Sequence, residues 1–320
     1  MRYREADLGR VRTVPLAGRR NKVDPSLLAA APGGDRTFSA FLDSLPDVLA
    51  ARDLRAVMAG VVSAAKTRRG VVLLVGGHVV KVGLGPLLCA LMERGIVTHI
   101  ALNGAAAIHD FELAAFGGTS EDVESGLADG SFGMAEETGA EMNAAIRVAA
   151  QAGQGMGEGL AAALHARAAL PGRTASLLLA AHELGVPVTV HAAIGAEITH
   201  QHPAADGAAI GATSHRDFRR LAGSLPSLHD GGAVLNLGSA VVLPEVFLKA
   251  LTIARNLESG RPTHFLAADF DMQRHYRPRL NVVQRPTRAG GKGYLLTGHH
   301  ELMIPLLVWG ILERMEKAEG

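Results

Sequence analysis

The 320-residue chain is poor in aromatic side chains and in cysteine. Phenylalanine, tyrosine and tryptophan make up 4% of the residues while 48% are hydrophobic, so the core must be built from aliphatic side chains. The single cysteine, Cys89, excludes an intramolecular disulfide and a cysteine-based metal site. Sparse cysteine is typical of a reducing compartment, and we expect a cytoplasmic protein.

The chain also has no excess of charge of one sign and no long hydrophobic run. Its 32 basic and 31 acidic residues predict no general attraction to nucleic acid or to an anionic membrane. The longest stretch without Asp, Glu, Lys or Arg, 95–109, is shorter than the roughly 18 apolar residues of a membrane helix. The charged first residues show no signal peptide. We therefore expect neither a membrane nor a nucleic-acid partner.

Short apolar runs alternate with amphipathic stretches along the chain. The runs that predict buried strands are 71–75, 97–102, 186–191, 233–237, 263–268, 280–284 and 293–297. Helices are predicted at 38–65, 84–94, 111–116, 136–150, 159–169, 174–184, 217–225, 244–257 and 302–317. Strands that alternate with helices imply βαβ units. We predict a three-layer α/β/α fold with a mainly parallel, doubly wound sheet over residues 70–320, preceded by a basic arm and a helical extension over residues 1–69.

Glycine is abundant, with 38 residues, and part of it falls where predicted strands end. Ligands of an open parallel sheet bind beyond the carboxyl ends of its strands. The glycines and small polar residues at these ends are Gly76, Gly77, Asn103, Gly104, Gly238, Ser239, Asp269 and Asp271. Glycine lets the backbone approach a phosphate closely. The GxGxxG fingerprint is absent, so the first strand-to-helix turn is not of the ordinary Rossmann type. A glycine-rich run at 151–159 predicts a flexible hinge or lid.

A first group of catalytic candidates follows the predicted strand 97–102. His109, Asp110 and Glu112 place an imidazole beside two carboxylates, and a histidine whose tautomer is fixed by a neighbour can act as a base. The alternative is that Asp110 caps a helix and His109 binds a loop carbonyl. The acidic stretch 120–137 could bind a cationic amine, or serve for capping and solvation, with Thr119 in front of a short acidic helix.

A second group follows the predicted strand 186–191. His191, Glu197, His200 and His202 could bind zinc or another divalent ion, contact a substrate, or have a structural role. Their spacing matches no metal motif, so all three interpretations stay open.

Two sets of motifs resemble known families. Residues 76–83, 97–104 and 107–112 resemble the NAD-binding domain of the archaeal-type ornithine cyclodeaminases. Residues 236–242, 270–271 and 293–307 resemble deoxyhypusine synthase. Both families belong to the deoxyhypusine synthase-like NAD/FAD-binding superfamily. The resemblance covers roughly residues 70–310 by scattered motifs and implies the fold of that superfamily.

The resemblance also implies a cofactor and a chemical step. NAD would take hydride from a carbon bearing an amine, and hydride would return after the imine has been attacked or eliminated. His109 would be the base, and Asp110, Glu112 or Glu245 would hold the amine of an amine or amino-acid substrate. Both families form tetramers with active sites at subunit contacts, which implies a homotetramer here.

Deoxyhypusine synthesis itself is not expected. The synthases need a lysine nucleophile before the Phe-Pro-Leu-Leu-type helix, and counting back from Pro305 reaches Arg285 and Pro286 instead. The resemblance therefore implies an NAD-dependent transferase or ammonia-lyase of another specificity. Two other functions stay open: a metal-dependent lyase or hydrolase that uses His191, His200 and His202, and a non-catalytic nucleotide-binding protein.

Overall fold

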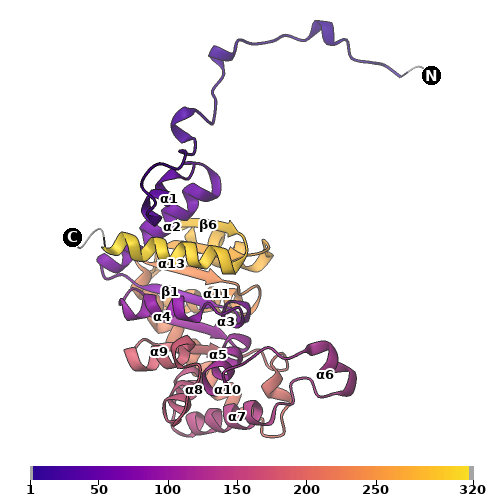
Figure 1. Cartoon of the computed structure of the whole chain (residues 1–320), viewed down its shortest axis with the longest axis vertical. Coiled ribbons are helices and arrows are strands. Elements are labelled where there is room, and N and C mark those ends of the chain that lie inside the picture. Colours follow the sequence, from indigo (N-terminus) through magenta and orange to yellow (C-terminus); the bar gives the residue numbers. More distant parts are fainter. Residues whose placement is uncertain (1–2, 317–320) are drawn as a thin grey trace.

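The computed structural model describes residues 3–316 and centres on a six-stranded sheet (Figure 1). The strands are β1 (Val71–Val75), β2 (His99–Asn103), β3 (Val188–His191), β4 (Ala233–Leu237), β5 (Leu266–Asp271) and β6 (Lys292–Thr297). They lie in the order β3-β2-β1-β4-β5-β6, and each adjacent pair is parallel. The predicted three-layer α/β/α fold with a parallel sheet is confirmed.

The central strand β1 shows why the apolar runs form strands. All five of its residues are buried. Val71, Leu73 and Val75 pack into a large core on one face of the sheet, while Val72 and Leu74 pack into a second core on the other face. A parallel strand covered on both faces needs an unbroken apolar sequence, and such a run is what the sequence has here.

Helices cover both faces of the sheet. The larger core includes side chains of α2 (Leu49–Lys66), α4 (Gly85–Glu93), α5 (Gly104–Phe116), α9 (Leu177–Leu184) and α13 (His300–Glu316). The second core includes side chains of α10 (Gly207–Ser224), α11 (Val242–Leu257) and the π-helical segment Pro278–Gln284. The other helices are α1 (Phe38–Ser44), α3 (Gly77–Lys81), α6 (Val123–Asp129), α7 (Glu136–Gln151), α8 (Met156–His165) and α12 (Arg285–Thr287). Short 3₁₀ turns are Leu8–Arg10, Leu16–Gly18, Pro25–Leu27, Arg173–Ala175, Ile198–Gln201 and Leu225–Leu228.

Two predicted elements are wrong. The apolar run 280–284 is part of the helical segment Pro278–Gln284, not a strand, and its Val282 and Val283 are buried in the second core. A short apolar run does not by itself distinguish a strand from a buried helical turn. The predicted helix 38–65 is broken in two, because Leu45 precedes Pro46 and a residue before proline disfavours the helical conformation.

The glycine-rich run 151–159 is a packed junction between α7 and α8, and not the flexible hinge that we predicted. Gly157 and Gly159 are buried at the start of α8. A Cβ atom on Gly157 would lie 2.4 Å from the carbonyl oxygen of Val188 in β3. Glycine is needed there because α8 approaches the edge strand so closely.

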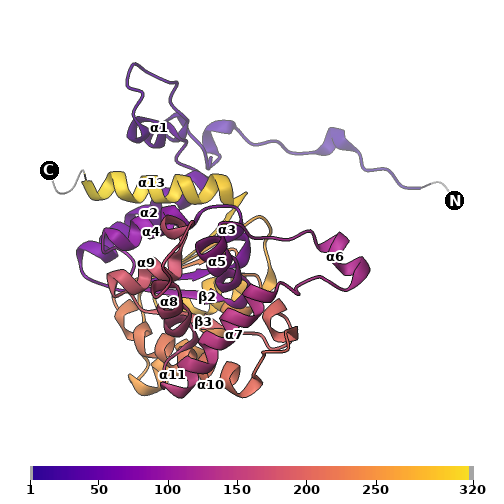
Figure 2. The ribbon, with the colours of Figure 1, turned by 60° about the horizontal axis from the view of Figure 1, so that its bottom comes forward.

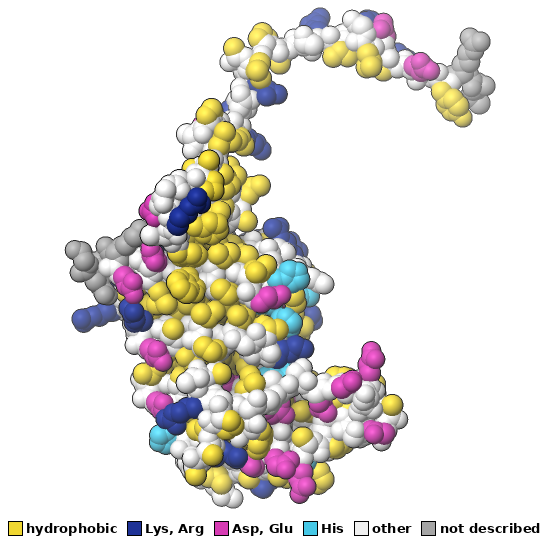
Figure 3. Space-filling view, in the orientation of Figure 1, with side chains coloured by type: hydrophobic (Ala, Val, Ile, Leu, Met, Phe, Trp, Pro, Cys, Tyr) yellow, Lys and Arg dark blue, Asp and Glu magenta, His cyan; other side chains and the backbone are white. Residues whose placement is uncertain are grey.

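The N-terminal residues divide into an arm and a packed helix. Residues 3–24 run away from the body with every side chain exposed (Figures 1 and 2), whereas the backbone of Leu27 and Ala30 bonds that of Asp47 and Ser44. By contrast, α2 buries Val57, Met58 and Val61 in the larger core. Apolar side chains gather on the face that carries α1 and α13 (Figure 3), where Phe41, Leu302 and Trp309 are exposed. None of the helices in residues 3–316 is long and apolar enough to cross a membrane.

The strand order reverses between β1 and β4, and we call the region beyond the carboxyl ends of these two strands the crevice. From β1 the chain winds outward to β3, and then returns through α10 to β4 on the other side of β1. At such a reversal the connections leave the two central strands in opposite directions. The crevice lies beyond the carboxyl ends of these strands, and it is where doubly wound sheets bind their ligands.

Candidate functional site

Glycines bring the carboxyl ends of β1 and β4 into close contact. A Cβ atom on Gly76 would lie 2.1 Å from the carbonyl oxygen of Gly238. Gly238 has a φ of +67°, and a Cβ atom there would lie 2.9 Å from Nε2 of His300. These glycines are therefore needed for the close packing of β1 and β4, and this need does not depend on which ligand binds in the crevice.

Two other predicted glycines allow helices to approach the same edge. A Cβ atom on Gly77, the first residue of α3, would lie 2.9 Å from Cβ of Ala105 and 3.3 Å from Cδ2 of His109. Gly104 begins α5, and Asn103 caps that helix by accepting a hydrogen bond from the amide of Ala106 at 2.9 Å. A Cβ atom on Gly104 would overlap the side chain of Glu197, which lies against the first turn of α5.

The crevice carries buried hydrogen-bond acceptors without partners. The side-chain amide of Asn236 donates to the carbonyl oxygen of Ser239 at 3.0 Å and to Asp269 at 2.7 Å. Nε2 of His300 donates to the carbonyl oxygen of Phe270 at 3.2 Å. Among residues 3–316, neither Oδ1 of Asn236 nor Nδ1 of His300 finds a donor. Buried acceptors of this kind fit a ligand that brings amide or hydroxyl donors.

The predicted carboxylates at the end of β5 belong to the same edge. Burial raises the pKa of Asp269 to about 7, and the nearby charge of Asp271 adds to the effect. Asp271 is itself buried as the last residue of the strand. Asp269 is therefore partly protonated at neutral pH and can donate as well as accept.

His109 lies at the head of a hydrogen-bond relay. Its Nδ1 is 2.8 Å from the hydroxyl oxygen of Thr119, and the Thr119 hydroxyl donates to Oε2 of Glu112. The hydroxyl of Thr138 donates to the other oxygen of Glu112 at 2.9 Å. Since the only proton of the Thr119 hydroxyl goes to Glu112, its oxygen accepts from Nδ1–H of His109. This order leaves Nε2 of His109 as a free base.

The environment keeps this base neutral near pH 7. Burial lowers the pKa of His109 below its ordinary value of 6.5, and the positive charge of Lys81 acts in the same direction. The carboxylate of Glu112 opposes both effects. A neutral imidazole with one fixed N–H and one free lone pair has the form that a general base requires.

His109 faces a cavity of about 290 Å³ beside the crevice. The charged and titratable side chains that line it are Lys81, His109, Glu112, Glu121 and Glu197. Phe132 and Ile198 form part of its apolar wall. One side is supplied by residues 117–135, which leave the body as a projecting excursion that carries α6 (Figure 2). We refer to this space as the His109 pocket.

Two predicted catalytic residues lie elsewhere. Asp110 is fully buried and caps α9: its carboxylate accepts from the hydroxyl of Ser176 at 2.7 Å and from the amides of Leu177 at 2.6 Å and Leu178 at 3.1 Å. Glu245 lies at the start of α11 and binds Lys249 and Asn281. Neither lines the His109 pocket, so neither is placed to hold an amine beside His109.

The histidines of the second predicted group have separate partners. His191 is buried, with Nε2 3.0 Å from the hydroxyl of Thr189. Nδ1 of His200 is 3.0 Å from Glu197, and Nδ1 of His202 accepts from the amide of Ala204 at 3.1 Å. Within residues 3–316, no group of three or more His, Cys, Asp or Glu side chains could hold a metal ion. The arrangement gives no support to the alternative in which these histidines bind a metal ion.

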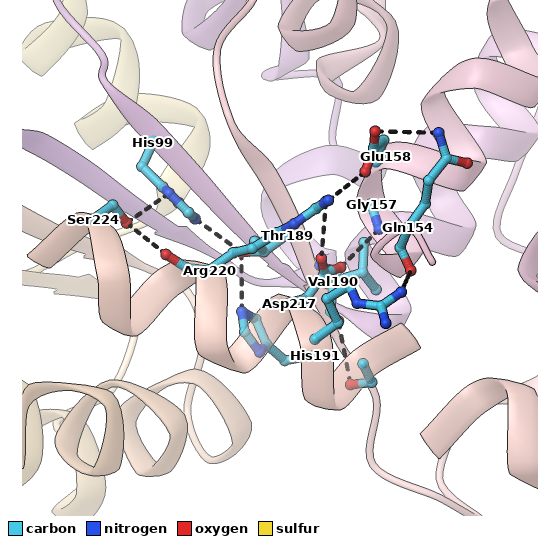
Figure 4. A network of polar contacts seen from close by, with 12 residues as sticks. His99, Gln154, Gly157, Glu158, Thr189, Val190, His191, Asp217, Arg220 and Ser224 are labelled. Atoms are coloured by element: carbon cyan, nitrogen blue, oxygen red, sulfur yellow. Dashed lines mark hydrogen bonds and ion pairs between the residues drawn. The ribbon is translucent and has the colours of Figure 1, made fainter. Parts of the chain in front are cut away.

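His191 is part of a buried polar chain, a series of hydrogen-bonded side chains that joins β3, β2 and α10 (Figure 4). Thr189 also contacts Nε2 of His99 at 3.0 Å, and Nδ1 of His99 is 2.8 Å from the hydroxyl of Ser224. The Ser224 hydroxyl donates to the carbonyl oxygen of Leu221, so His99 donates from Nδ1 and accepts from Thr189. Thr189 in turn accepts from His191. Burial lowers the pKa of His99 to about 4 and of His191 to about 3, so both stay neutral.

Asp217 lies beside this chain and offers a test of the electrostatics (Figure 4). Its Oδ2 accepts from the amides of Gly157 at 2.8 Å and Val190 at 2.9 Å, and burial raises its pKa from 3.8 to about 7. As the pH rises from about 4 to about 7, the unfolded chain releases this proton before the folded protein does. The stability that Asp217 contributes through its proton is therefore lost over this range.

We expect Asp217→Asn to abolish that dependence. An asparagine oxygen can still accept the two amides, but the side chain has no proton to release. The free energy of unfolding of the wild type relative to Asp217→Asn should fall with rising pH, by about 1.4 kcal/mol for each unit by which the pKa is raised. Urea denaturation of both proteins at several pH values between 4.5 and 7.5 measures this difference in the free energy of unfolding. A constant difference would contradict the raised pKa.

The sequence analysis missed three residues of the site: Lys81 lines the His109 pocket, and Thr119 and Thr138 bind Glu112 in the relay. Thr119 was assigned to helix capping, but Asp122 is the residue that caps α6. Thr138 lies in α7 and is part of no motif, and Lys81 lies in α3 within the motif 76–83, which gives it no role of its own. A signal was available for one contact: His109 and Glu112 are three residues apart, which puts them on the same face of a helix. Because the helix was predicted to begin at 111, that spacing was not used.

Comparison with solved structures gives the relationship of the fold. The chain superimposes on a conserved protein described as LOR/SDH from Methanococcus maripaludis S2 with a TM-score of 0.50 and 15% identity, over 84% of this chain and 71% of that one. It superimposes on AgrE, in a ternary complex with ornithine and NAD⁺, with a TM-score of 0.52 and 15% identity, over 84% of this chain. The chain spans about a third of the length of AgrE, 34%.

Sequence comparison adds no closer assignment, since no family model and no curated protein matches. Identities of this size relate the structures and not the activities. The likenesses agree with the parallel sheet and its helical layers, which the sequence motifs had implied. The chain therefore has the three-layer fold of these two proteins.

Proposed function

We propose that the chain is an NAD-dependent enzyme that acts on the amine-bearing carbon of an amine or amino-acid substrate. The observation that carries this proposal is the free Nε2 of His109 in a pocket that adjoins the switch point of the sheet. The strand order supports a dinucleotide in the crevice. AgrE, which shares the fold, was crystallised with ornithine and NAD⁺.

The crevice has groups suited to a dinucleotide. Gly76 is the N-cap of α3 at the end of β1, and the unpartnered acceptors of Asn236 and His300 would take hydroxyl or amide donors. When bound, NAD would accept a hydride from the substrate carbon and return it. The sequence has no GxGxxG pattern, which agrees with a turn in which Gly76 and Gly77 are needed for close packing.

The chain's own residues supply the proton chemistry. Nε2 of His109 would accept the proton of the substrate ammonium group, because only the free amine can become an imine. The positive charge on the imidazole would be stabilised through Thr119 by Glu112. Glu121 and Glu197 could hold a second cationic group, and Lys81 a carboxylate. Apolar walls keep bulk water from the base.

Nucleotide binding is the direct test. Purified protein should show saturable binding of NADH, followed by fluorescence, and of NAD⁺, followed by calorimetry. Amines and amino acids should then be screened for formation of NADH at 340 nm. Nucleotide binding without turnover of any amine would favour the non-catalytic alternative, and absence of binding of both nucleotides would reject the proposal.

The relay makes a more specific prediction at Thr119. Thr119→Val keeps the shape but removes the hydroxyl that joins His109 to Glu112, and we expect kcat to fall about 10- to 100-fold with little change in KM. Thr119→Ser keeps the hydroxyl and should stay within a few-fold of wild type. The imidazolium loses its link to Glu112 in the valine variant, so the acid limb of the pH profile should move to lower pH. Equal kinetics for the two variants would argue against the relay.

A further inference from the structure

A second cavity opens at the opposite edge of the sheet from the crevice. It has a volume of about 540 Å³ and lies between α8, α9 and α10, at the amino ends of β2 and β3. Its walls are apolar where Ala161, Ala181, Val186 and Val188 face it. We call it the amino-edge cavity. The proposed function makes no use of it.

An ion pair stands at the wall of the amino-edge cavity (Figure 4). Nη2 of Arg220, on α10, is 2.6 Å from Oε2 of Glu158, on α8. The two side chains are 38% and 37% exposed, so the pair lies at the mouth of the cavity. An ion pair so open to water contributes little to stability, and separating its partners costs little.

Three polar side chains form the floor of the cavity, and the exposed imidazole of His182 on α9 also lines it. His99 and Thr189 reach it from the strands, and Ser224 from α10, but these three groups already satisfy one another. The floor is therefore neutral, and the hydrogen bonds of its polar groups are made within the protein. A ligand would find its charged contacts at Arg220 and Glu158, and its apolar contacts along Val186 and Val188.

We propose that the amino-edge cavity binds a free α-amino acid with an apolar side chain. The carboxylate of the ligand would pair with Arg220 and its ammonium group with Glu158, while its side chain lies on the apolar wall. A zwitterion exchanges one ion pair for two and leaves no charge without a partner. A simple cation or anion would pair with one residue and strand the other.

Gly223 provides a variant that closes the cavity without disturbing the fold. It lies on α10, lines the cavity, and a Cβ atom there would meet no atom within 4 Å. Gly223→Leu should therefore fill open space and favour the helix. Gly211 is a matched control: it is on the same helix, its Cβ would also meet nothing within 4 Å, and it does not line the cavity.

Three probes of the same shape separate the contacts: L-leucine, 3-methylbutylamine, which lacks the carboxylate, and 4-methylpentanoate, which lacks the ammonium group. In titrations followed by NMR or calorimetry, we expect leucine to bind at least 10-fold more tightly than either analogue. Gly223→Leu should abolish this binding and Gly211→Leu should leave it unchanged. Arg220→Met should reduce the affinity for leucine to that for the amine.

Other results would overturn the proposal. Failure of leucine, valine and phenylalanine to bind the wild type rejects the amino-acid site. Binding that persists in Gly223→Leu but disappears in His109→Gln belongs to the His109 pocket and also rejects it. The test does not depend on nucleotide binding, so the NAD proposal can fail while this one stands, and the reverse.

Discussion

Replacing His109 by glutamine should lower kcat by about 100- to 10,000-fold, the range usual for a lost general base. The glutamine side chain has similar length and can still bond Thr119, but it cannot take a proton from an ammonium group. Affinity for NADH should stay within a few-fold of wild type, because the crevice glycines and acceptors are untouched. Steady-state kinetics and a parallel nucleotide titration measure the two quantities.

The pH profile of the wild type checks the same base. Only neutral His109 can accept the proton, so kcat/KM should rise with pH through the pKa of this residue. Because burial and Lys81 lower that pKa, the acid limb should have its midpoint below 6.5. His182→Gln is the matched control, since His182 is an exposed histidine on α9 outside the His109 pocket. An unchanged kcat in His109→Gln would reject the assigned base.

Replacing the neighbouring Asp110 by alanine should lower the free energy of unfolding by about 3–5 kcal/mol. The carboxylate accepts three hydrogen bonds at the start of α9, and its loss leaves a hydroxyl and two amides buried without an acceptor. Water cannot easily replace it, because Asp110 is fully buried. Chemical denaturation followed by circular dichroism measures the effect.

Two controls separate stability from catalysis at this position. Asp129→Ala removes the exposed last residue of α6, whose carboxylate bonds only the neighbouring Ser131, and should change the unfolding midpoint little. Ser176→Ala removes one of the three donors together with the N-cap of α9, and should cost less than Asp110→Ala. If Asp110→Ala unfolds like wild type but has lost activity, Asp110 has a catalytic role that its position in the fold does not explain.

The strands were predictable from the sequence because they are buried on both faces. The run 71–75 is unbroken and apolar, the run 233–237 is apolar except for Asn236, and both have glycine on either side; their bounds match the structure. The candidate residues at the carboxyl edge, such as Gly76 and Gly238, could be predicted because they directly follow these strands. The order of the strands could not be read in this way, because it depends on packing between segments far apart in the chain.

The pocket was only partly predictable, for a related reason. Adjacent residues on a helix point about 100° apart, so His109 and Asp110 face different neighbours although the sequence joins them. Asp110 meets the start of α9, 66 residues further on. Thr119 reaches His109 across the turn that ends α5, and the same local sequence is compatible with capping. Contacts made by tertiary packing decide such cases.

In the polar chain from Ser224 through His99 and Thr189 to His191, the hydrogen bond from the Ser224 hydroxyl to the carbonyl oxygen of Leu221 sets the order of donors and acceptors. Each imidazole therefore has one fixed tautomer, and neither ring should ionise in the range where exposed histidines do. Two ring N–H protons, on Nδ1 of His99 and Nε2 of His191, are shielded from exchange with water. They should appear as downfield resonances in a proton NMR spectrum and stay at constant shift between pH 6 and 8. The protein thus contains its own spectroscopic marker for an intact edge of the sheet.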